Sequence, residues 1–194
     1  NGEPLVYERD PEDPGKEYLR PVRYGDIAVL FRAMTNVKLY EYQFRRAGIP
    51  FHVVGGRGFL QKQEVFDCTN MLRALYNRYD AIALVGVLRS PFFGISDETL
   101  YWLSRDADVI QGLGCFDKEE FREKLKPRIS AHQLMRLEEA HRILKKFRTL
   151  VLHLPVSELL RQVILETGYD KVALTKYDGE QIYANLEKLI ELAA

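Results

Sequence analysis

The chain has 194 residues, of which 46% are hydrophobic and 29% charged, and its 28 basic and 28 acidic side chains give a formal net charge of zero. This composition is typical of a soluble globular protein, with length for one domain or parts of two. The zero net charge excludes attraction of nucleic acid by bulk charge, so that binding would need a local patch. No stretch approaches the roughly 18 apolar residues of a membrane span.

The cysteines indicate the redox environment of the chain, and its first residues indicate whether it is part of a longer protein. Cys68 and Cys115 are isolated and form neither a CxxC pair nor a disulfide framework, which favours a reduced, cytoplasmic environment. The chain starts with Asn1-Gly2 and shows no signal peptide. We therefore expect an excised piece of a longer protein.

The first 54 residues predict a small α/β segment. Residues 1–20, rich in acidic residues, proline and glycine, indicate an exposed loop with one short strand at Leu5–Glu8. The apolar run Ile27–Phe31 is typical of a strand buried on both faces of a parallel sheet. A second buried strand is expected at Ile49–Val54.

A helix should join these two strands. From Asn36 to Ala47 the residues Val37, Tyr40 and Phe44 recur at helical spacing, and Gly48 is suited to end the helix. Strand, helix and strand predict a βαβ unit with a right-handed crossover.

After Gln63 the pattern is helical. A first helix carries an apolar stripe formed by Val65, Cys68, Met71, Leu72, Leu75 and Tyr76. Further helices are expected over 81–88, from a cap at Ser96, over 131–153, from a cap at Ser157 to Gly168, and from about Glu180 to the end, with breaks at 89–94, 111–117 and Pro155.

The fold class predicted is therefore mixed α/β and mostly α. We expect an N-terminal loop or short strand at 1–24, an α/β segment at 25–79 and a helical bundle at 80–194, with the junction near Tyr79-Asp80.

The glycine-rich segment "HVVGGRGFLQKQEVFD" is a candidate for a nucleotide-binding loop. A phosphate-binding loop needs a lysine and a hydroxyl after its last glycine, but Phe59 and Leu60 follow Gly58. A dinucleotide loop needs a third glycine where Gln61 stands. We interpret the glycines as a tight turn that uses positive φ angles.

Other candidate sites also have simpler explanations. Ser96, Asp97 and Glu98 in "FFGISDET" indicate the start of a helix and not a magnesium-binding strand end. Neither cysteine has a sequence neighbour that would activate it. The four histidines have no metal-ligand spacing; they are His52, His132, His141 and His153.

Basic residues concentrate between Arg122 and Arg148. Nine lysines and arginines stand there against three glutamates, a local excess of six positive charges. Such a stretch is suited to nucleic-acid phosphates, and equally to the solvated face of an amphipathic helix.

The order of several motifs resembles the second motor domain of superfamily 1 DNA helicases of the UvrD type. The motifs are "YGDIAVLFRA", "AGIPFHVVGGRGFLQKQEVFD" and "MLRALYN". Phe59, Glu64 and Asp67 fall on the F…E…D positions of that family, and Lys62 replaces its usual arginine, which keeps the charge but loses the planar fork. "VLRSPFFGISDETL" and "LLRQVILETGYDKVALTKYDGEQIYANLEKLIELA" resemble the AddA and RecB branch, the helicase–nuclease subunits.

The resemblance implies a fragment of a motor that translocates on DNA with ATP. Residues 25–79 would be part of a RecA-like 2A domain, and residues 80–194 the 2B arm. The chain has no ATPase motif, so ATP and Mg would be cofactors of the parent, and none is expected in this fragment. The parent's implied partners are single-stranded DNA, a duplex junction and an AddB/RecC-like subunit, with no membrane.

The resemblance and the basic stretch together predict residues that contact DNA. No catalytic or metal-binding residue is expected. The candidates are Arg32, Arg57, Lys62, Arg142, Lys145 and Lys146. The alternative is a non-enzymatic helical adaptor that grips an acidic protein partner.

Overall fold

A β-hairpin opens the part of the chain that the computed structural model describes, which is residues 5–10, 13, 15–51, 53 and 59–194. Strand β1 (Leu5–Arg9) pairs antiparallel with β2 (Glu17–Pro21), with Leu5 opposite Pro21. The strand predicted at Leu5–Glu8 is confirmed. The loop expected over the rest of the first twenty residues is wrong for residues 17–20, which belong to β2, because a charged edge strand is recognised by its pairing and not by its composition.

Arg20 on β2 joins the hairpin to the residues that follow. Its guanidinium donates to both carboxylate oxygens of Asp26, at 2.6 and 2.7 Å, and it also pairs with Glu8 on β1. Asp26 ends the 3-10 turn η1 (Tyr24–Asp26) and accepts the backbone N–H of Arg23. One side chain therefore connects both strands to η1.

The two buried strands predicted for the βαβ unit are not present in the described residues. Residues 27–31 are irregular, with Ile27 59% and Leu30 92% exposed. Ile49, Pro50, Phe51 and Val53 are also outside any strand, while His52 and Val54 lie outside the described residues. The apolar pattern shows which residues favour burial, but a strand forms only where another strand supplies hydrogen-bond partners.

The helix between these segments is confirmed as α1 (Val37–Arg46), preceded by the 3-10 turn η2 (Met34–Asn36). Gly48 follows with φ of +66°, the left-handed conformation that glycine adopts without strain. Aromatic rings join α1 to its flanks, with ring centroids of Phe31 and Tyr40 4.7 Å apart and those of Phe44 and Phe51 5.6 Å apart.

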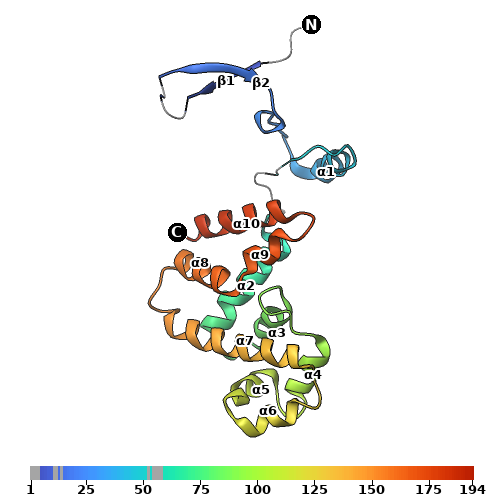
Figure 1. Ribbon diagram of the computed structural model, residues 1–194, viewed down its shortest axis with the longest axis vertical. Coiled ribbons are helices and arrows are strands. Elements are labelled where there is room, and N and C mark those ends of the chain that lie inside the picture. The colour runs from blue at the N-terminus through green and yellow to red at the C-terminus, as the bar shows by residue number, and fades with distance from the viewer. Residues whose placement is uncertain (1–4, 11–12, 14, 52, 54–58) are drawn as a thin grey trace. The chain divides into compact units, whose positions relative to one another are not determined.

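Residues 58–194 form a second compact unit, distinct from residues 1–57, and in its described part every regular element is helical (Figure 1). The limits predicted near residues 24 and 79 for the domains of a longer motor stay predictions. The α-helices are α2 (Gln63–Tyr76), α3 (Ala81–Arg89), α4 (Asp97–Ser104), α5 (Val109–Gly114), α6 (Glu119–Leu125), α7 (Ala131–Leu150), α8 (Val156–Thr167), α9 (Tyr169–Leu174) and α10 (Gly179–Leu192), and the 3-10 turns are η3 (Phe59–Gln61) and η4 (Cys115–Asp117).

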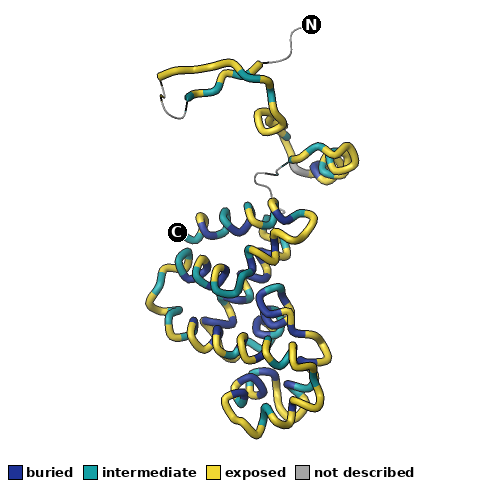
Figure 2. The backbone as a smooth tube through the Cα atoms, viewed as in Figure 1, coloured by how far each residue is buried: buried dark blue, intermediate teal, exposed yellow. Residues whose placement is uncertain are grey.

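Within this unit, α8, α9 and α10 lie at one end and α4, α5 and α6 at the other, with α7 extending between them (Figure 1). Helix α2 packs against α3, α7 and α10. The most buried large side chains include Phe93, Phe116, Phe147 and Met71, and the dark segments of Figure 2 follow this core. Most of the predicted stripe of α2 is buried, but Tyr76 is 77% exposed.

The predicted break at 111–117 is wrong. Asp108 accepts the backbone N–H of Gln111 at 2.8 Å and starts α5, and η4 continues it. The cap predicted at Ser157 is also wrong, because Pro155 holds the cap position of α8 and Ser157 lies in the first turn. The caps at Ser96 and Gly168 are confirmed, whereas helix α7 stops three residues before His153.

Among the described residues, none of the helices combines the length and the hydropathy of a membrane span.

Gly112 explains why the glycines of α5 do not break the helix. A Cβ at this position would lie 2.1 Å from the carbonyl oxygen of Leu103 on α4, so glycine permits close packing of the two helices. We expect Gly112→Ala to lower the free energy of unfolding by about 1–3 kcal/mol. Chemical denaturation measures this change.

Gly114, on the same helix, is the matched control. A Cβ there meets nothing within 4 Å, and its φ is −66°. Gly114→Ala should therefore leave stability unchanged or raise it by up to about 1 kcal/mol. Equal losses in both variants would contradict the packing role of Gly112.

Candidate functional site

Two of the three family-motif positions are buried carboxylates on α2. Glu64 is 6% exposed and Asp67 is 2% exposed. Carboxylates at this depth need hydrogen-bond donors, because an unpaired buried charge is strongly unfavourable. Each carboxylate has a donor on one of the last helices of the chain, more than a hundred residues away in sequence.

Asp67 is held by a tyrosine and a glutamine. The hydroxyl of Tyr169 at the start of α9 donates to Oδ2 at 2.8 Å, and Nε2 of Gln63 donates to Oδ1 at 2.8 Å. Burial raises the pKa of Asp67, and burial also raises the pKa of Tyr169. The tyrosine therefore remains a neutral donor.

Glu64 is held by an asparagine on α10. Nδ2 of Asn185 donates to Oε1 of Glu64 at 2.5 Å, and Oδ1 of Asn185 accepts from Gln181 at 3.1 Å. The two carboxylates thus fasten α2 to α9 and α10. Since both are enclosed by protein, they position helices and do not present a surface to a ligand.

The remaining motif position, Phe59, lies on η3, and Lys62, which replaces the usual arginine, follows η3. The ammonium of Lys188 on α10 lies 5.0 Å from the centroid of the Phe59 ring. Lys62 is half-buried at the N-cap position of α2. Arg57 and the glycines at 55, 56 and 58 lie outside the described residues, so the interpretation of that segment as a tight turn stays a prediction.

The segment "VLRSPFFGISDETL" is held by two side chains of α7. Gln133 accepts the backbone N–H of Ser96 at 3.0 Å and donates to the carbonyl of Gly94 at 3.2 Å. Nη1 of Arg136 donates to the carbonyl of Phe93 at 2.8 Å. Gly94 has φ of +59°, and a Cβ there would lie 3.1 Å from Arg136. Arg136 therefore stabilises this turn.

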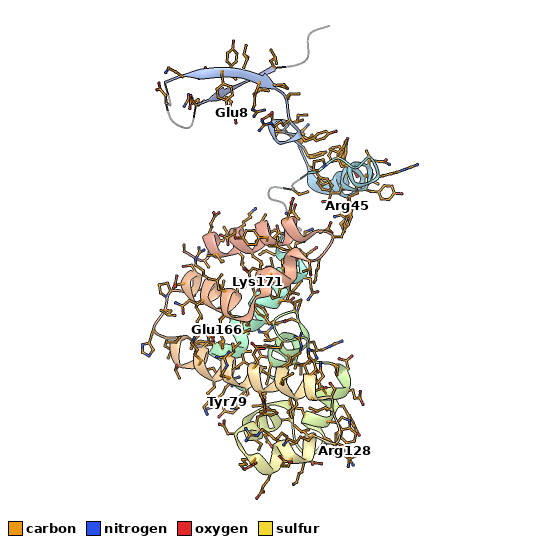
Figure 3. All side chains as sticks on the ribbon, viewed as in Figure 1. Glu8, Arg45, Tyr79, Arg128, Glu166 and Lys171 are labelled. Atoms are coloured by element: carbon orange, nitrogen blue, oxygen red, sulfur yellow. The ribbon has the colours of Figure 1, made fainter. Side chains whose placement is uncertain are left out.

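The three candidate DNA contacts on α7 lie on its exposed surface, each paired with an acid. Glu166 on α8 binds Arg142 at 3.0 Å and Lys146 at 2.5 Å, and the label in Figure 3 marks its place on α8. Lys145 lies 2.8 Å from Asp117 of η4. The acids come from outside the basic stretch, so the fold partly neutralises the local charge excess.

Asp117 also faces His141 of α7. Nε2 of His141 lies 3.0 Å from Oδ1 of Asp117, and Nδ1 lies 3.0 Å from the carbonyl oxygen of Leu113. Hydrogen bonding to Lys145 lowers the pKa of Asp117. Asp117 is thus a charged contact between η4 and α7.

Other basic residues of the stretch have structural partners. Arg148 donates to the carbonyl of Ala74 through Nε at 3.3 Å and Nη2 at 3.2 Å. The guanidinium of Arg128 lies 4.6 Å from the ring centroid of Trp102, and Lys126 pairs with Glu123. Arg32, in residues 1–57, is exposed after the irregular segment.

Cys68 is not placed as a reactive group, because it lies inside the core. Cys68 is fully buried on α2, and burial raises its pKa to about 12. In the described part of the chain no three side chains of the His, Cys, Asp or Glu type gather as metal ligands. Sequence reasoning missed Tyr169 and Asn185 as motif partners, although the "TGY" and "ANL" strings that contain them were visible.

Tyr169→Phe tests the link between α2 and α9. The change removes one donor from a buried carboxylate and keeps the ring, so we expect a loss of about 1–3 kcal/mol in the free energy of unfolding. Tyr79→Phe, at a tyrosine that is 76% exposed, is the control and should change stability little. Denaturant titration compares the two, and equal effects would contradict the role of Tyr169.

Glu166→Gln tests the ion pairs between α7 and α8. Hydrogen bonds from Lys146 and Arg142 lower the pKa of Glu166 below its ordinary value of 4.5. Its stabilising contribution is therefore present above pH 4.5 and is lost as pH falls through the lowered folded-state pKa. We expect the unfolding free energy of Glu166→Gln to fall less steeply below that pH than the wild type, in denaturation series across pH.

The exposed Glu191 near the end of α10 provides the control, since Glu191→Gln removes a carboxylate that takes no part in the pairs with Arg142 and Lys146. The free energy of unfolding of Glu191→Gln should fall with decreasing pH as it does for the wild type. Identical curves for Glu166→Gln and wild type would show that the pairs with α7 contribute nothing.

Comparison with known proteins agrees with the motif order. The model of the UvrD-like helicase C-terminal domain matches residues 16–192. The chain is 31% identical over 182 residues to an ATP-dependent helicase/nuclease subunit of Lysinibacillus sphaericus strain C3-41, and 30% identical over 178 residues to its counterpart in Ruminiclostridium cellulolyticum. Each match covers 90% of the chain and 14% of the relative, so the chain spans about one seventh of their length. The chain belongs to the UvrD-like helicase C-terminal domain family and is similar to helicase/nuclease subunits of the AddA type.

Proposed function

We propose that this chain is the DNA-contacting and arm portion of an ATP-dependent helicase/nuclease that acts in recombinational double-strand break repair. The chain contributes no ATPase motif. ATP and Mg would be bound by other parts of the parent. The parent would translocate on single-stranded DNA towards a duplex junction, together with an AddB/RecC-like partner protein.

The observation that supports the proposal is the connection of the motif helix α2 to the C-terminal helices. Glu64 and Asp67, which stand at family-motif positions, bind Asn185 and Tyr169 across the unit. A movement transmitted to α2 would thus carry α9 and α10 with it. This is what a lever attached to a motor requires, because a rigid arm needs contacts that do not open to solvent.

The surface proposed for DNA is the row of cations on α7. Arg142, Lys145 and Lys146 have side chains 59%, 66% and 48% exposed. Exposed ion pairs stabilise a fold by about 0–1 kcal/mol. The carboxylates of Asp117 and Glu166 can therefore be exchanged for phosphate oxygens at small cost.

Binding of the chain to a fluorescently labelled forked DNA tests this surface. In anisotropy titrations we expect affinity to fall with salt, by a logarithmic slope of about −0.9 for each phosphate contacted. The double variant Lys145→Glu, Lys146→Glu should bind at least about tenfold more weakly and show a shallower slope. Glu166→Gln should bind more tightly, because Arg142 and Lys146 lose their competing carboxylate.

A second double variant, Lys118→Glu with Lys171→Glu, controls for net charge. It reverses two exposed lysines that are not on α7. It should retain most of the affinity. Equal loss of affinity in both double variants would mean that DNA binding depends on net charge and not on the α7 surface. Binding that does not change with salt, or no binding, would favour the alternative of a protein-binding adaptor. The same substitutions in the full-length parent should lower unwinding in the same order.

A further inference from the structure

A groove of about 710 Å³ opens within the unit formed by residues 58–194. Of the three cations proposed for DNA contact on α7, Lys145 lines this groove, whereas Arg142 and Lys146 do not. Its lining comes from the C-terminal end of α2 and the residues that follow, and from α3, α5, η4, α7 and the turn after α7. These segments are far apart in sequence. The groove is therefore created by the packing of the helices.

The groove has an aliphatic wall. Leu75, Leu84 and Leu144 line it from the buried core, and Leu152 and Tyr76 line it with 79% and 77% exposure. Exposed apolar side chains next to a buried apolar surface indicate a place where a partner can cover them.

Two arginines in the lining lack an acidic partner. In the described part of the chain neither Arg78 nor Arg148 lies within 4 Å of a carboxylate, whereas Lys145 in the same lining is paired with Asp117. Arg148 uses Nε and Nη2 on the carbonyl of Ala74, and within the described residues Nη1 has no acceptor. The lining thus contains three basic side chains against one carboxylate.

The environment of Arg148 is unusual for a guanidinium. Burial and the neighbouring charge of Arg78 lower its pKa. A half-buried cation next to another cation, without a carboxylate, is suited to an incoming anion, since a guanidinium matches a carboxylate with two parallel hydrogen bonds.

We propose that this groove is a docking site for an acidic amphipathic peptide segment of a protein partner. The apolar side chains of the segment pack on the wall formed by Leu75, Leu144 and Leu152. A carboxylate of the segment binds Arg148 and Arg78. An apolar surface that anchors a short segment, with charges that set its orientation, is a common mode of peptide recognition.

The lining favours a peptide over single-stranded nucleic acid. Sites for single strands combine cations with aromatic rings on which bases stack. Here seven of the lining residues are Leu, Ile or Val. The rings among the described lining residues are those of Tyr76 and His141, and His141 is already held by Asp117 and the carbonyl of Leu113. Aliphatic walls suit leucine-like side chains better than base planes.

Selection from a display library of random peptides of about 12 residues tests the proposal without assuming a sequence. We expect the enriched peptides to combine leucine, isoleucine or phenylalanine with aspartate or glutamate within about one helical turn. The strongest peptide, labelled and titrated against the 194-residue chain, should bind at least about tenfold more weakly to Arg78→Glu and to Leu152→Glu. Both positions are exposed, so the variants should fold.

Lys124→Glu on α6 reverses an exposed charge outside the lining and should leave the peptide affinity unchanged. The proposal is overturned if no peptide is enriched, if the enriched peptides carry no carboxylate, or if the two groove variants bind as well as the wild type. Binding of an oligothymidylate of about 20 nucleotides that both groove variants abolish would assign the groove to nucleic acid instead. Forked-DNA binding by α7 does not depend on Leu152, so the two proposals can fail separately.

Discussion

The helical unit depends on two buried carboxylates whose partners come from the other end of the chain. Glu64 and Asp67 lie on one face of α2, where water cannot solvate them, so that their donors must come from protein. Asn185 and Tyr169 supply those donors from α10 and α9. Because an apolar neighbour would leave the carboxylates unpaired, this constraint also selects one packing of the C-terminal helices against α2.

Helix α7 is the second organising element, and its side chains explain why a basic stretch is not a uniformly positive surface. Arg136 supports the turn at Phe93, and Arg148 supports the C-terminal end of α2. Arg142, Lys145 and Lys146 remain on the surface, where Asp117 and Glu166 face them. The surface proposed for DNA is therefore one whose carboxylates must first be displaced. The two arginines without a carboxylate partner lie in the groove, which Lys145 and Asp117 also line.

Seven of the ten described α-helices could be predicted from the sequence, because periodic apolar positions and caps act locally. Ser96 and Gly168 show this, since each sets a helix end through its own backbone neighbourhood. The short helices α5, α6 and α9 were not expected. The predictions that were wrong concern segments whose structure depends on contacts with other parts of the fold. Ile27–Phe31 has the composition of a buried strand, but the described chain supplies no strand to pair with it. The pattern around Gly112 predicts a break, although this glycine permits α4 and α5 to approach.

The sequence by itself determined the family, through motifs whose order is preserved along the chain, and the positions of most helices, through local periodicity. It also marked Glu64 and Asp67 as motif residues, but it did not indicate that they are buried or what binds them. Only the tertiary structure decided that Tyr169 and Asn185 hold them, that Asp117 and Glu166 neutralise the cations of α7, and that Arg78 and Arg148 meet at one groove. The physical reason is that hydrogen bonds and ion pairs act over a few ångströms in space, whereas these partners are separated by tens of residues in sequence.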